Sequence, residues 1–425
     1  MFRRISSSLA LIWVVVLFVV PLPLLAAFSL CGSGLTPGIG FGIIAYSWML
    51  TAVYLASRPR WADRLVGLPH LYMVHGILSV CALGLAWAHA LLSTLAGLAA
   101  TFGFAALYLL TFLVLCALVF LAGWLAQRVR WVAQLRRRLE RGIRRETSVR
   151  VHLLTLVAVA LVFLHVQGIA YIRENIAFTV LFYVETVLVV GAFFGRGLRE
   201  RNATVTATVK GACQVAERTT EVTLALPRGA KLPWQPGDFA FLRFPSVEGM
   251  GDFHPFSMSN VPAAGGDLRF DIRADGDFTR AVADLTPGTK AEVMVPYGRY
   301  EQVIDTHPAD APIVMIAGGI GVTPLLSILL AHAQDAREVS FLYGARSERD
   351  MVYADEIRAV AREHDNVHVV LRAGGRLEEG EVEARMRPGA IYLIAGPYPM
   401  QRAWRRFLFE RGVDADDIYY EPFSM

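Results

Sequence analysis

Hydrophobic residues divide the chain near its middle. The first 200 residues hold six apolar runs, each long enough to cross a bilayer as a helix, at about 5–30, 38–56, 70–92, 100–127, 149–171 and 175–195. From Asn202 onward, apolar and polar residues alternate between turns that contain Pro and Gly, which is typical of strands. The pattern predicts a membrane half followed by a soluble half.

The soluble half itself shows two patterns. The strand pattern continues to about residue 305 and predicts a small antiparallel β-barrel. From Ala311 the order is a buried strand, a glycine turn, a helix from Thr323 to Ala333 and a second strand, which predicts a βαβ unit. We therefore expect an all-α six-helix membrane domain at 1–200, a β-barrel at 201–307 and an α/β nucleotide-binding domain at 308–425.

The first apolar run, from Ile5 to Leu30, has two interpretations. A cleaved signal peptide is one, but the run is long for its apolar region, and the residues before Cys31 make a poor lipoprotein cleavage site. We therefore expect an uncleaved span.

The amino-acid composition agrees with a membrane half and a soluble half, and it excludes several classes of function. Hydrophobic residues make up 55% of the chain, and the mean hydropathy is +0.44. The net charge is only +4, and the arginines gather in short loops beside the apolar runs, so the sequence does not predict nucleic-acid binding. The four cysteines form no CxxC pair, so neither a disulfide framework nor a zinc site is expected.

The arginine-rich loops predict an orientation in the membrane. Arg58 to Arg64 follow the second run, and nine arginines lie between Arg128 and Arg150, whereas the loops near 31–37 and 93–99 carry no Lys or Arg. Both termini are therefore expected on the cytoplasmic side of a bacterial-type cell membrane. The nine-arginine loop has two other interpretations, docking on anionic lipid and docking on the soluble half.

Four histidines lie on the third and fifth apolar runs. His75 and His89 are 14 residues apart, about 21 Å along a helix, and His152 and His165 are 13 apart, about 20 Å. The two pairs thus reach similar depths, and the geometry fits two stacked bis-histidine haems. Thirteen residues on an ideal helix turn His165 about 140° from the face of His152, which this hypothesis does not explain. The alternative is four separate core histidines that bond backbone carbonyls.

Other polar residues of the membrane half have two interpretations each. Glu185 lies in the middle of a run and serves either a proton path or a helix-packing hydrogen bond. Arg173 meets a haem propionate or the headgroup layer, and His70 is expected at the interface rather than as a ligand.

The histidine spacing resembles that of the transmembrane domain of NADPH oxidases and ferric reductases. With the predicted orientation, the resemblance implies an inner haem held by His75 and His152 and an outer haem held by His89 and His165.

A second resemblance concerns residues 254–260, HPFSMSN. This stretch is similar to the flavin-binding motif of the ferredoxin-reductase superfamily, in the HPF[ST] form of its membrane members. The resemblance implies that Ser257 bonds the isoalloxazine near its reactive nitrogen, and that His254 and Pro255 lie against the flavin and ribityl. The remaining implied FAD-binding residues of the motif are Phe256, Ser259 and Asn260.

Residues 276–279, GDFT, look like the GxxT turn of the same superfamily. Gly276 and Thr279 would open a helix whose N-terminus suits a pyrophosphate, and Arg273 could add a cation. The alternative is an ordinary strand, turn and helix.

Residues 318–324, GGIGVTP, join a strand to a helix, and such a turn lets the backbone approach a phosphate. The turn resembles the GGxGxTP nicotinamide-nucleotide motif, which implies nucleotide binding by Gly319, Gly321, Thr323 and Pro324. Arg346 and Arg372 are candidate partners of a 2′-phosphate, and the alternative for each is a solvated surface arginine.

Two further elements complete the resemblance. Gly396 and Pro397 match the CGP or AGP element under the nicotinamide, with Ala395 where the oxidases usually have cysteine. Phe423 is the candidate for the near-terminal aromatic that covers the flavin ring. Ser257 and Phe423 are thus the implied catalytic residues.

Together these features imply a transmembrane oxidoreductase. NAD(P)H would reduce FAD, and electrons would pass through the two haems to an acceptor outside, most simply O2 giving superoxide. Relatives of the oxidase type carry an arginine in the second span and a histidine one turn after the outer ligand, where this chain has Ser93. A ferric or cupric reductase is therefore the main alternative, and a nucleotide-regulated transporter or sensor is a distant one. No EF-hand or Pro-rich docking segment is found, so we expect no obligate regulatory subunit.

Overall fold

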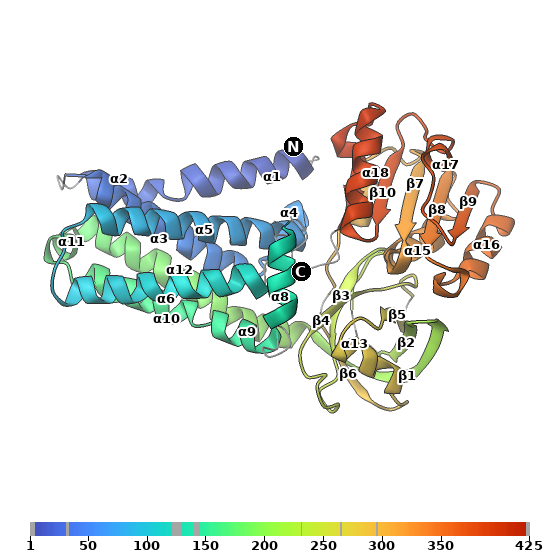
Figure 1. Cartoon of the computed structure of the whole chain (residues 1–425), viewed down its shortest axis with the longest axis horizontal. Coiled ribbons are helices and arrows are strands. Elements are labelled where there is room, and N and C mark those ends of the chain that lie inside the picture. Colours follow the sequence, from blue (N-terminus) through green and yellow to red (C-terminus); the bar gives the residue numbers. More distant parts are fainter. Residues whose placement is uncertain are drawn as a thin grey trace. The chain divides into compact units, whose positions relative to one another are not determined.

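The computed structural model of the chain describes residues 5–30, 34–120, 129–139, 145–230, 232–263, 266–294 and 296–421. The chain forms two compact units, one from Ser7 to Leu198 and one that holds most of the chain from Arg199 onward. Figure 1 labels the helices and strands of both units.

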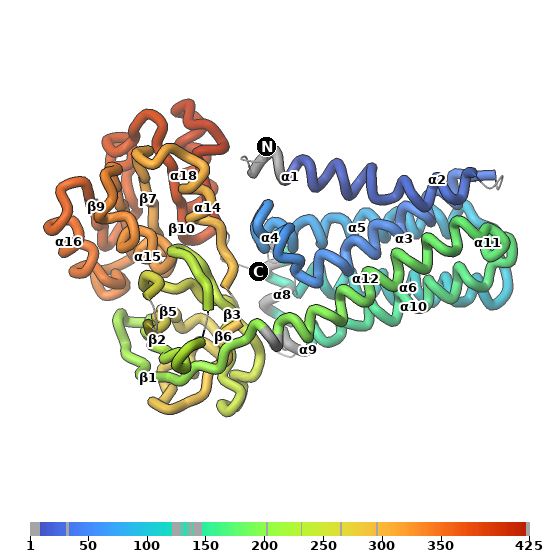
Figure 2. The backbone as a smooth tube through the Cα atoms, turned by 180° about the vertical axis from the view of Figure 1, so that it is seen from behind, coloured from blue at the N-terminus to red at the C-terminus, as the bar shows by residue number. Residues whose placement is uncertain are grey.

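The described ranges of the N-terminal unit fold into helices. They are α1 (Ile5–Val14), α2 (Leu22–Leu30), α3 (Pro37–Ala56), α4 (Arg60–Val66), α5 (Leu68–Leu92), α6 (Leu98–Phe120), α8 (Arg130–Leu139), α9 (Arg145–His152), α10 (Thr155–Gln167), α11 (Ala170–Glu174) and α12 (Ile176–Ala203). Among the described residues, six helical segments are long and apolar enough to cross a membrane: Leu9–Leu30, Pro37–Ala56, Leu68–Leu92, Leu98–Phe120, Thr147–Gln167 and Ile176–Glu200. The prediction of six apolar helices is confirmed, and the long helices lie side by side in both views (Figures 1 and 2).

The first and the last of the six apolar helices differ from their predicted form. The first is interrupted by a π-helical turn at Val15–Val19, where the Val20 N–H donates to the Val15 carbonyl at 2.9 Å. Pro21 follows directly, and because proline has no N–H to continue the ladder, the apolar run becomes two helices. The last helix is longer than expected, since α12 continues to Ala203 instead of ending near 195.

The first part of the C-terminal unit is a six-stranded antiparallel sheet. Its elements are β1 (Thr204–Ala216), β2 (Thr219–Ala225), β3 (Phe239–Arg243), β4 (His254–Ser257), β5 (Leu268–Arg273), α13 (Asp277–Ala281) and β6 (Lys290–Met294). The strand order is β4-β3-β6-β1-β2-β5, and a bridge between Met258 and Phe270 joins the two edge strands. This bridge closes the sheet into the predicted barrel, with residues such as Phe244 and Val222 buried inside.

The second part is a five-stranded parallel sheet covered by helices. Its elements are α14 (Tyr300–Ile304), β7 (Ile313–Gly318), α15 (Val322–His332), β8 (Val339–Ala345), α16 (Ala354–Glu363), β9 (Val367–Ala373), α17 (Glu379–Glu383), β10 (Ile391–Ala395), α18 (Tyr398–Glu410) and β11 (Ile418–Tyr420). The strand order is β11-β10-β7-β8-β9. All six residues of β7 are buried, as expected for a central parallel strand with both faces covered.

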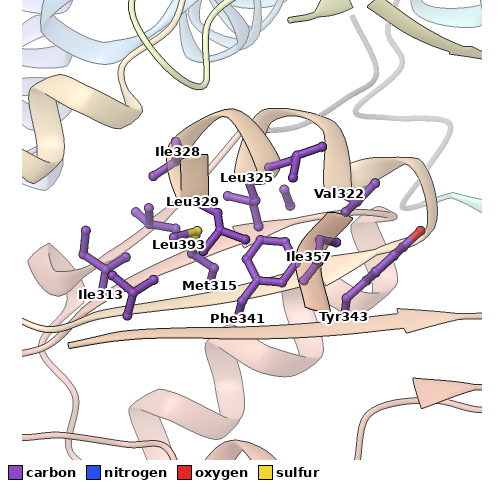
Figure 3. Close-up of a cluster of buried hydrophobic side chains, with 14 of the residues drawn as sticks. Ile313, Met315, Val322, Leu325, Ile328, Leu329, Phe341, Tyr343, Ile357 and Leu393 are labelled. Atoms are coloured by element: carbon purple, nitrogen blue, oxygen red, sulfur yellow. The ribbon is translucent and has the colours of Figure 1, made fainter. Parts of the chain in front are cut away.

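Alternate residues of the central strands enter two different cores. Ile313 and Met315 pack with Leu325 and Leu329 of α15 on one face of the sheet, as Figure 3 shows. Val314 lies on the other face, in the cluster formed with α18. Because a strand alternates its side chains, this two-sided packing holds the carboxyl ends of the strands in fixed positions.

A histidine at the end of α15 predicts a pH-dependent stability. His332 Nε2 lies 2.9 Å from Glu301 of α14, and Nδ1 lies 2.6 Å from Asp335. Burial by itself lowers the pKa of His332, but the hydrogen bonds to the two carboxylates outweigh it and raise the pKa above the ordinary value of 6.5. The charged imidazole therefore stabilises the fold fully below pH 6.5, and this stability is lost as the pH rises through the raised pKa.

We expect His332→Gln to lower stability by on the order of 1 kcal/mol at pH 6 and by less at pH 8.5. Calorimetric melting of the purified chain at both pH values measures the difference. A gap between wild type and variant that stays constant with pH would contradict the assignment.

Candidate functional site

The topology of the parallel sheet predicts where a ligand binds. From β7 the chain proceeds to β8 and β9 on one side, then crosses back to β10 and β11 on the other. The strand order therefore reverses between β7 and β10, and ligands of open α/β sheets bind at the carboxyl ends of such a strand pair.

The predicted glycine turn lies at this point. Gly319 has φ +56°, which favours glycine, and it follows β7 directly. Gly321 packs on the neighbouring strand end, because a Cβ added there would overlap the Ala395 carbonyl and lie 2.6 Å from the Gly396 nitrogen. The turn and the AGP element are thus brought together from positions about 75 residues apart.

The other residues of the two nucleotide motifs support the backbone. Thr323 is buried, and its hydroxyl donates to the Ile320 carbonyl at 3.0 Å; Pro324 is buried in the first turn of α15. Pro397 is exposed, next to the start of α18. Their contribution to a nucleotide site is therefore the shape of the turn and the N–H groups that it leaves free.

The flavin motif forms β4 at the edge of the barrel. His254, Pro255, Phe256 and Ser257 are all half-buried, so each keeps a surface that a ligand could contact. The His254 ring lies 4.1 Å from the ring of Phe278, centroid to centroid. Phe278 is buried in the barrel core and therefore supports the His254 ring from the inside, although the sequence motif did not single it out.

Two residues at the end of the motif are engaged within the protein. Ser259 is fully buried; its hydroxyl accepts from Arg269 Nε at 3.1 Å. The Asn260 amide donates to the Asp267 carbonyl at 2.8 Å and accepts from the Arg269 N–H at 3.0 Å. These side chains close the loop that leads to β5, so any part they take in FAD binding is through the backbone.

The GDFT turn opens a very short helix. The Thr279 hydroxyl accepts from the Gly276 N–H at 2.8 Å and from the Asp275 N–H at 2.9 Å, so it holds the turn that precedes α13. Arg273 lies beside Gly319, since a Cβ added at that glycine would be 3.8 Å from the Arg273 guanidinium. Arg273 therefore joins the barrel strand β5 to the glycine turn.

The two candidate arginines for a 2′-phosphate differ in their surroundings. Arg372 pairs with two carboxylates, 2.6 Å from Glu381 and 3.0 Å from Glu378. The hydrogen bond to Glu381 and the charges of both groups raise the pKa of Arg372 above the ordinary value for arginine. Arg346 is exposed just after β8 and makes no ion pair within the described part of the chain. Arg346 is therefore the better placed of the two for a phosphate.

Hydrogen bonds from Gln401 hold Glu421, the last described residue, near Gly396. Gln401 donates to the Gly396 carbonyl at 3.0 Å and to the Glu421 carbonyl at 2.9 Å. The predicted flavin-covering residue, Phe423, lies outside the described residues.

In the N-terminal unit the four histidines form two opposed pairs. The ring centroids are 6.1 Å apart for His75 and His152 and 6.0 Å apart for His89 and His165. A metal–nitrogen bond of about 2 Å on each side, plus the distance from each nitrogen to the centre of its ring, gives a separation of about 6 Å for two opposed ligands.

Backbone carbonyls fix most of these rings. Three histidines donate a hydrogen bond from Nδ1 to a backbone carbonyl, each at 2.8 Å. The pairs are His75 with Ala52, His89 with Gly38, and His165 with Ala99. A proton on Nδ1 leaves Nε2 unprotonated, as a metal ligand requires. Nδ1 of His152 is buried and has no hydrogen-bond partner among the described residues.

The winding of the fifth helix accounts for much of the mismatch in the 13-residue spacing. The helix is interrupted at Leu153 and Leu154, between α9 and α10. Four bonds there run from residue i to i−3: Leu153 to Arg150, Leu154 to Val151, Leu156 to Leu153 and Val157 to Leu154. Such winding turns each residue about 20° further than an α-helix, so four recover about 80° of the 140° offset. The 14-residue spacing of His75 and His89 is itself about 40° short of whole turns, so with this winding the two pairs differ by only about 20°.

Two glycines make room for the outer pair. A Cβ at Gly42 of α3 would be 2.8 Å from His89 Nδ1, and one at Gly103 of α6 would be 2.7 Å from His165 Nδ1. The opposed imidazoles, the carbonyl bonds and these glycine contacts fit a pair of bis-histidine haem sites.

One cluster was not predicted from the sequence. Tyr353, just before α16, bonds to Glu221 of β2 and Asp271 of β5. Neither residue type nor spacing indicated this contact, because its members lie far apart in the chain. The positive φ of Tyr353, +59°, is unusual for a bulky residue and is visible only in the structure.

Comparisons with known proteins agree with the site in the C-terminal unit. Residues 208–318 match the family described as "FAD-binding domain", and residues 315–406 match the "Oxidoreductase NAD-binding domain". The C-terminal half therefore contains an FAD-binding domain followed by an oxidoreductase NAD-binding domain.

Similar proteins are reductases and flavohemoproteins. The reductase component of propane 2-monooxygenase from Rhodococcus jostii (strain RHA1) is 29% identical over 47% of this chain and 58% of its own. A flavohemoprotein from Rhodopirellula baltica is 34% identical over 33% of this chain and 38% of its own. A crystal structure of an Amycolatopsis cytochrome P450 reductase is 26% identical, with a TM-score of 0.46 over 52% of this chain and 69% of that one. The chain thus spans about 40 to 60% of the length of the first curated relatives that it matches.

Proposed function

We propose that this protein moves electrons across a membrane, from NAD(P)H through FAD and two b-type haems to an acceptor on the other side. Dioxygen is the proposed acceptor and superoxide the product. The observation that carries the proposal is the two imidazole pairs, at 6.1 and 6.0 Å, in a unit whose helices are long and apolar enough to cross a membrane.

The histidines would serve as axial ligands of the haem irons. His75 with His152 would hold the inner haem, and His89 with His165 the outer one. When bound, haem supplies one-electron transfer at the iron. Two histidines at each site would leave no open position for an acceptor, so electron transfer to the acceptor would be outer-sphere.

The C-terminal unit would supply the electrons. When bound, FAD would supply the link between two-electron hydride chemistry and one-electron transfer. The half-buried Ser257 would bond the flavin, the turn at Gly319 would hold a nucleotide phosphate, and Arg346 would meet a 2′-phosphate if NADPH is the donor. We expect turnover without an added regulatory subunit.

Orientation follows from charge. The arginine-rich loops would keep both termini and the C-terminal unit in the cytoplasm of a bacterial-type cell, with lipid around the six helices. Electrons would then leave on the outer side.

A ferric or cupric reductase is the second candidate, and one residue favours it. Ser93 lies one turn after His89, with its hydroxyl 3.3 Å from Nδ1 of that ring. A neutral hydroxyl stands there in place of the further histidine found in relatives of the oxidase type, which weakens the case for a site tuned to oxygen.

A visible spectrum of the detergent-purified chain, before and after NADPH under argon, tests the electron path. We expect six-coordinate b-type bands that become reduced when the nucleotide is added. A colourless protein after haem-replete expression would exclude the proposal and favour a nucleotide-regulated transporter or sensor.

The acceptor requires a separate test. In air, the loaded protein with NADPH should produce superoxide that superoxide dismutase removes. Rapid reduction of ferric chelates under argon with little superoxide in air would instead identify a metal reductase.

Gly42→Ala tests the packing of the outer pair. The new methyl group would press on the His89 ring, so we expect haem affinity at that pair to fall roughly tenfold or more. The haem-to-protein ratio after gel filtration measures the loss. Gly84→Ala on α5 is the control, because a Cβ there meets nothing within 4 Å; equal haem loss in both variants would refute the packing argument.

A further inference from the structure

A tyrosine joins the nucleotide-binding part of the C-terminal unit to the barrel. The Tyr353 hydroxyl oxygen is hydrogen-bonded to Glu221 Oε2 and lies 2.6 Å from Asp271 Oδ1. Glu221 and Asp271 are directly opposite each other on β2 and β5. One phenol therefore meets two carboxyl groups that also face each other.

The closed arrangement of these three groups requires one protonated carboxyl group. Each of the two oxygen–oxygen contacts needs a hydrogen, and the phenol supplies only one. The second must come from a carboxylic acid that donates to the phenol oxygen while the phenol donates to the other carboxylate. Two ionised carboxylates directly opposite would also repel each other.

The surroundings favour this shared proton. Asp271 is 4% exposed, and burial raises its pKa to about 6. The other charged or titratable groups beside the cluster are Arg269 of β5, Glu356 of α16, Tyr343 of β8 and Cys213 of β1, which is paired opposite Glu221. Arg269 is the only cation among them. Its guanidinium lies 4.6 Å from the centre of the Tyr353 ring and 3.4 Å from Glu356. One cation thus faces three carboxyl groups. It can neutralise only one negative charge, so protonation of another carboxyl group is favoured.

The cluster lies beside the other contacts between barrel and sheet. The Glu217 N–H donates to the Arg349 carbonyl at 3.0 Å, a few residues before Tyr353. Ser327 of α15 donates to the Asn260 carbonyl at 2.6 Å, directly after the flavin motif. Breaking the Tyr353 hydrogen bonds would therefore weaken the interface that positions the glycine turn relative to the flavin strand.

We propose that Tyr353, Glu221 and Asp271 form a proton-dependent latch that positions the nucleotide-binding part against the barrel for hydride transfer. Tyr353 is a positioning residue in this proposal. With the shared proton the latch is closed. When the proton leaves to solvent as the pH rises, the two carboxylates repel each other and the latch opens more often. The inference concerns the FAD and NAD(P)H module alone and does not depend on the haem proposal.

Hydrogen–deuterium exchange on the full chain measures latch opening without any turnover. After correction for intrinsic rates, opening of residues 354–363 should be about tenfold greater at pH 7.5 than at pH 5, from the difference between a carboxyl pKa of about 6 and one of about 4. Anaerobic stopped-flow reduction of bound FAD by NADPH should slow over the same pH range.

Three variants separate the latch from simple stability. Asp271→Asn stays neutral at every pH, so exchange and hydride transfer should keep their low-pH values at both pH values. Tyr353→Phe keeps the ring that contacts Arg269 and loses both bonds, so it should show the high-pH behaviour throughout. Tyr392→Phe, a buried tyrosine of β10, should keep the wild-type pH response.

A wild-type pH response in Asp271→Asn would overturn the proposal, and so would one in Tyr353→Phe. If Tyr353→Phe does not fold, the near-isosteric variants Asp271→Asn and Glu221→Gln test the latch by themselves. Loss of the pH response in these two variants supports the latch. A retained pH response refutes the latch.

Discussion

Replacing His89 by leucine is expected to lower the haem content of the purified chain from about two per protein to about one. Leucine keeps the apolar volume of the side chain but offers no nitrogen to a metal. His165 would then face a hydrocarbon side chain in place of the imidazole whose ring centre is 6.0 Å away. The pair formed by His75 and His152 is unchanged, so one haem should remain and still be reduced by NADPH.

Transfer to the outside should stop in the same variant. Pyridine-haemochrome analysis gives the haem ratio, and acceptor reduction in proteoliposomes measures transfer across the membrane. His70→Leu is the matched control, since His70 is on the same helix but outside the two pairs. Two haems retained in His89→Leu, or one lost in His70→Leu, would mean that the pairs are not ligands. Reduction of FAD by NADPH should be equal in both variants, which separates the haem proposal from the flavin module.

Gly321→Ala is expected to weaken NAD(P)H binding more than tenfold and to cost about 1–3 kcal/mol of stability. Gly321 has φ −63°, so alanine causes no backbone strain, and the whole effect must come from space. The added methyl group would meet the backbone of Ala395 and Gly396, which cannot move aside as a side chain can. The carboxyl ends of β7 and β10 would be forced apart where the nucleotide is expected.

Titration with NADPH, followed by the flavin absorbance under argon, gives the binding constant. Gly380→Ala on α17 is the control, because a Cβ there meets nothing within 4 Å and alanine favours helix. Bound FAD should be the same in both variants, since the barrel is not touched. Unchanged NADPH affinity in Gly321→Ala would show that the turn is not the nucleotide site.

Local patterns allowed much of the fold to be predicted. The apolar runs, the barrel strands and the strand–turn–helix at Gly319 depend on residues close in sequence, and each is found near its predicted position, although three of the apolar helices differ in length or continuity. The order of barrel and parallel sheet also follows from such patterns. Local patterns fail where helix geometry is not ideal. No residue near Leu153 and Leu154 predicts the tighter winding there.

Side-chain roles were harder to predict than elements. Ser259 and Thr279 match motif positions, yet their hydroxyls bond within the protein, and a motif does not say where a hydroxyl points. The Tyr353 latch joins β2, β5 and the segment before α16, and its contacts cross more than 80 residues. Such contacts depend on how the barrel and the sheet pack, which hydrophobic periodicity does not encode.

The tight winding in the fifth helix also bears on how such chains diverge. Fourteen α-helical residues rise about 21 Å, and thirteen residues with four in the tighter winding rise nearly the same distance. The winding therefore compensates a one-residue deletion in length as well as in rotation. Insertions and deletions between paired histidines can be tolerated during evolution wherever the helix is able to rewind. A search pattern that demands equal spacing on both helices would therefore miss this chain.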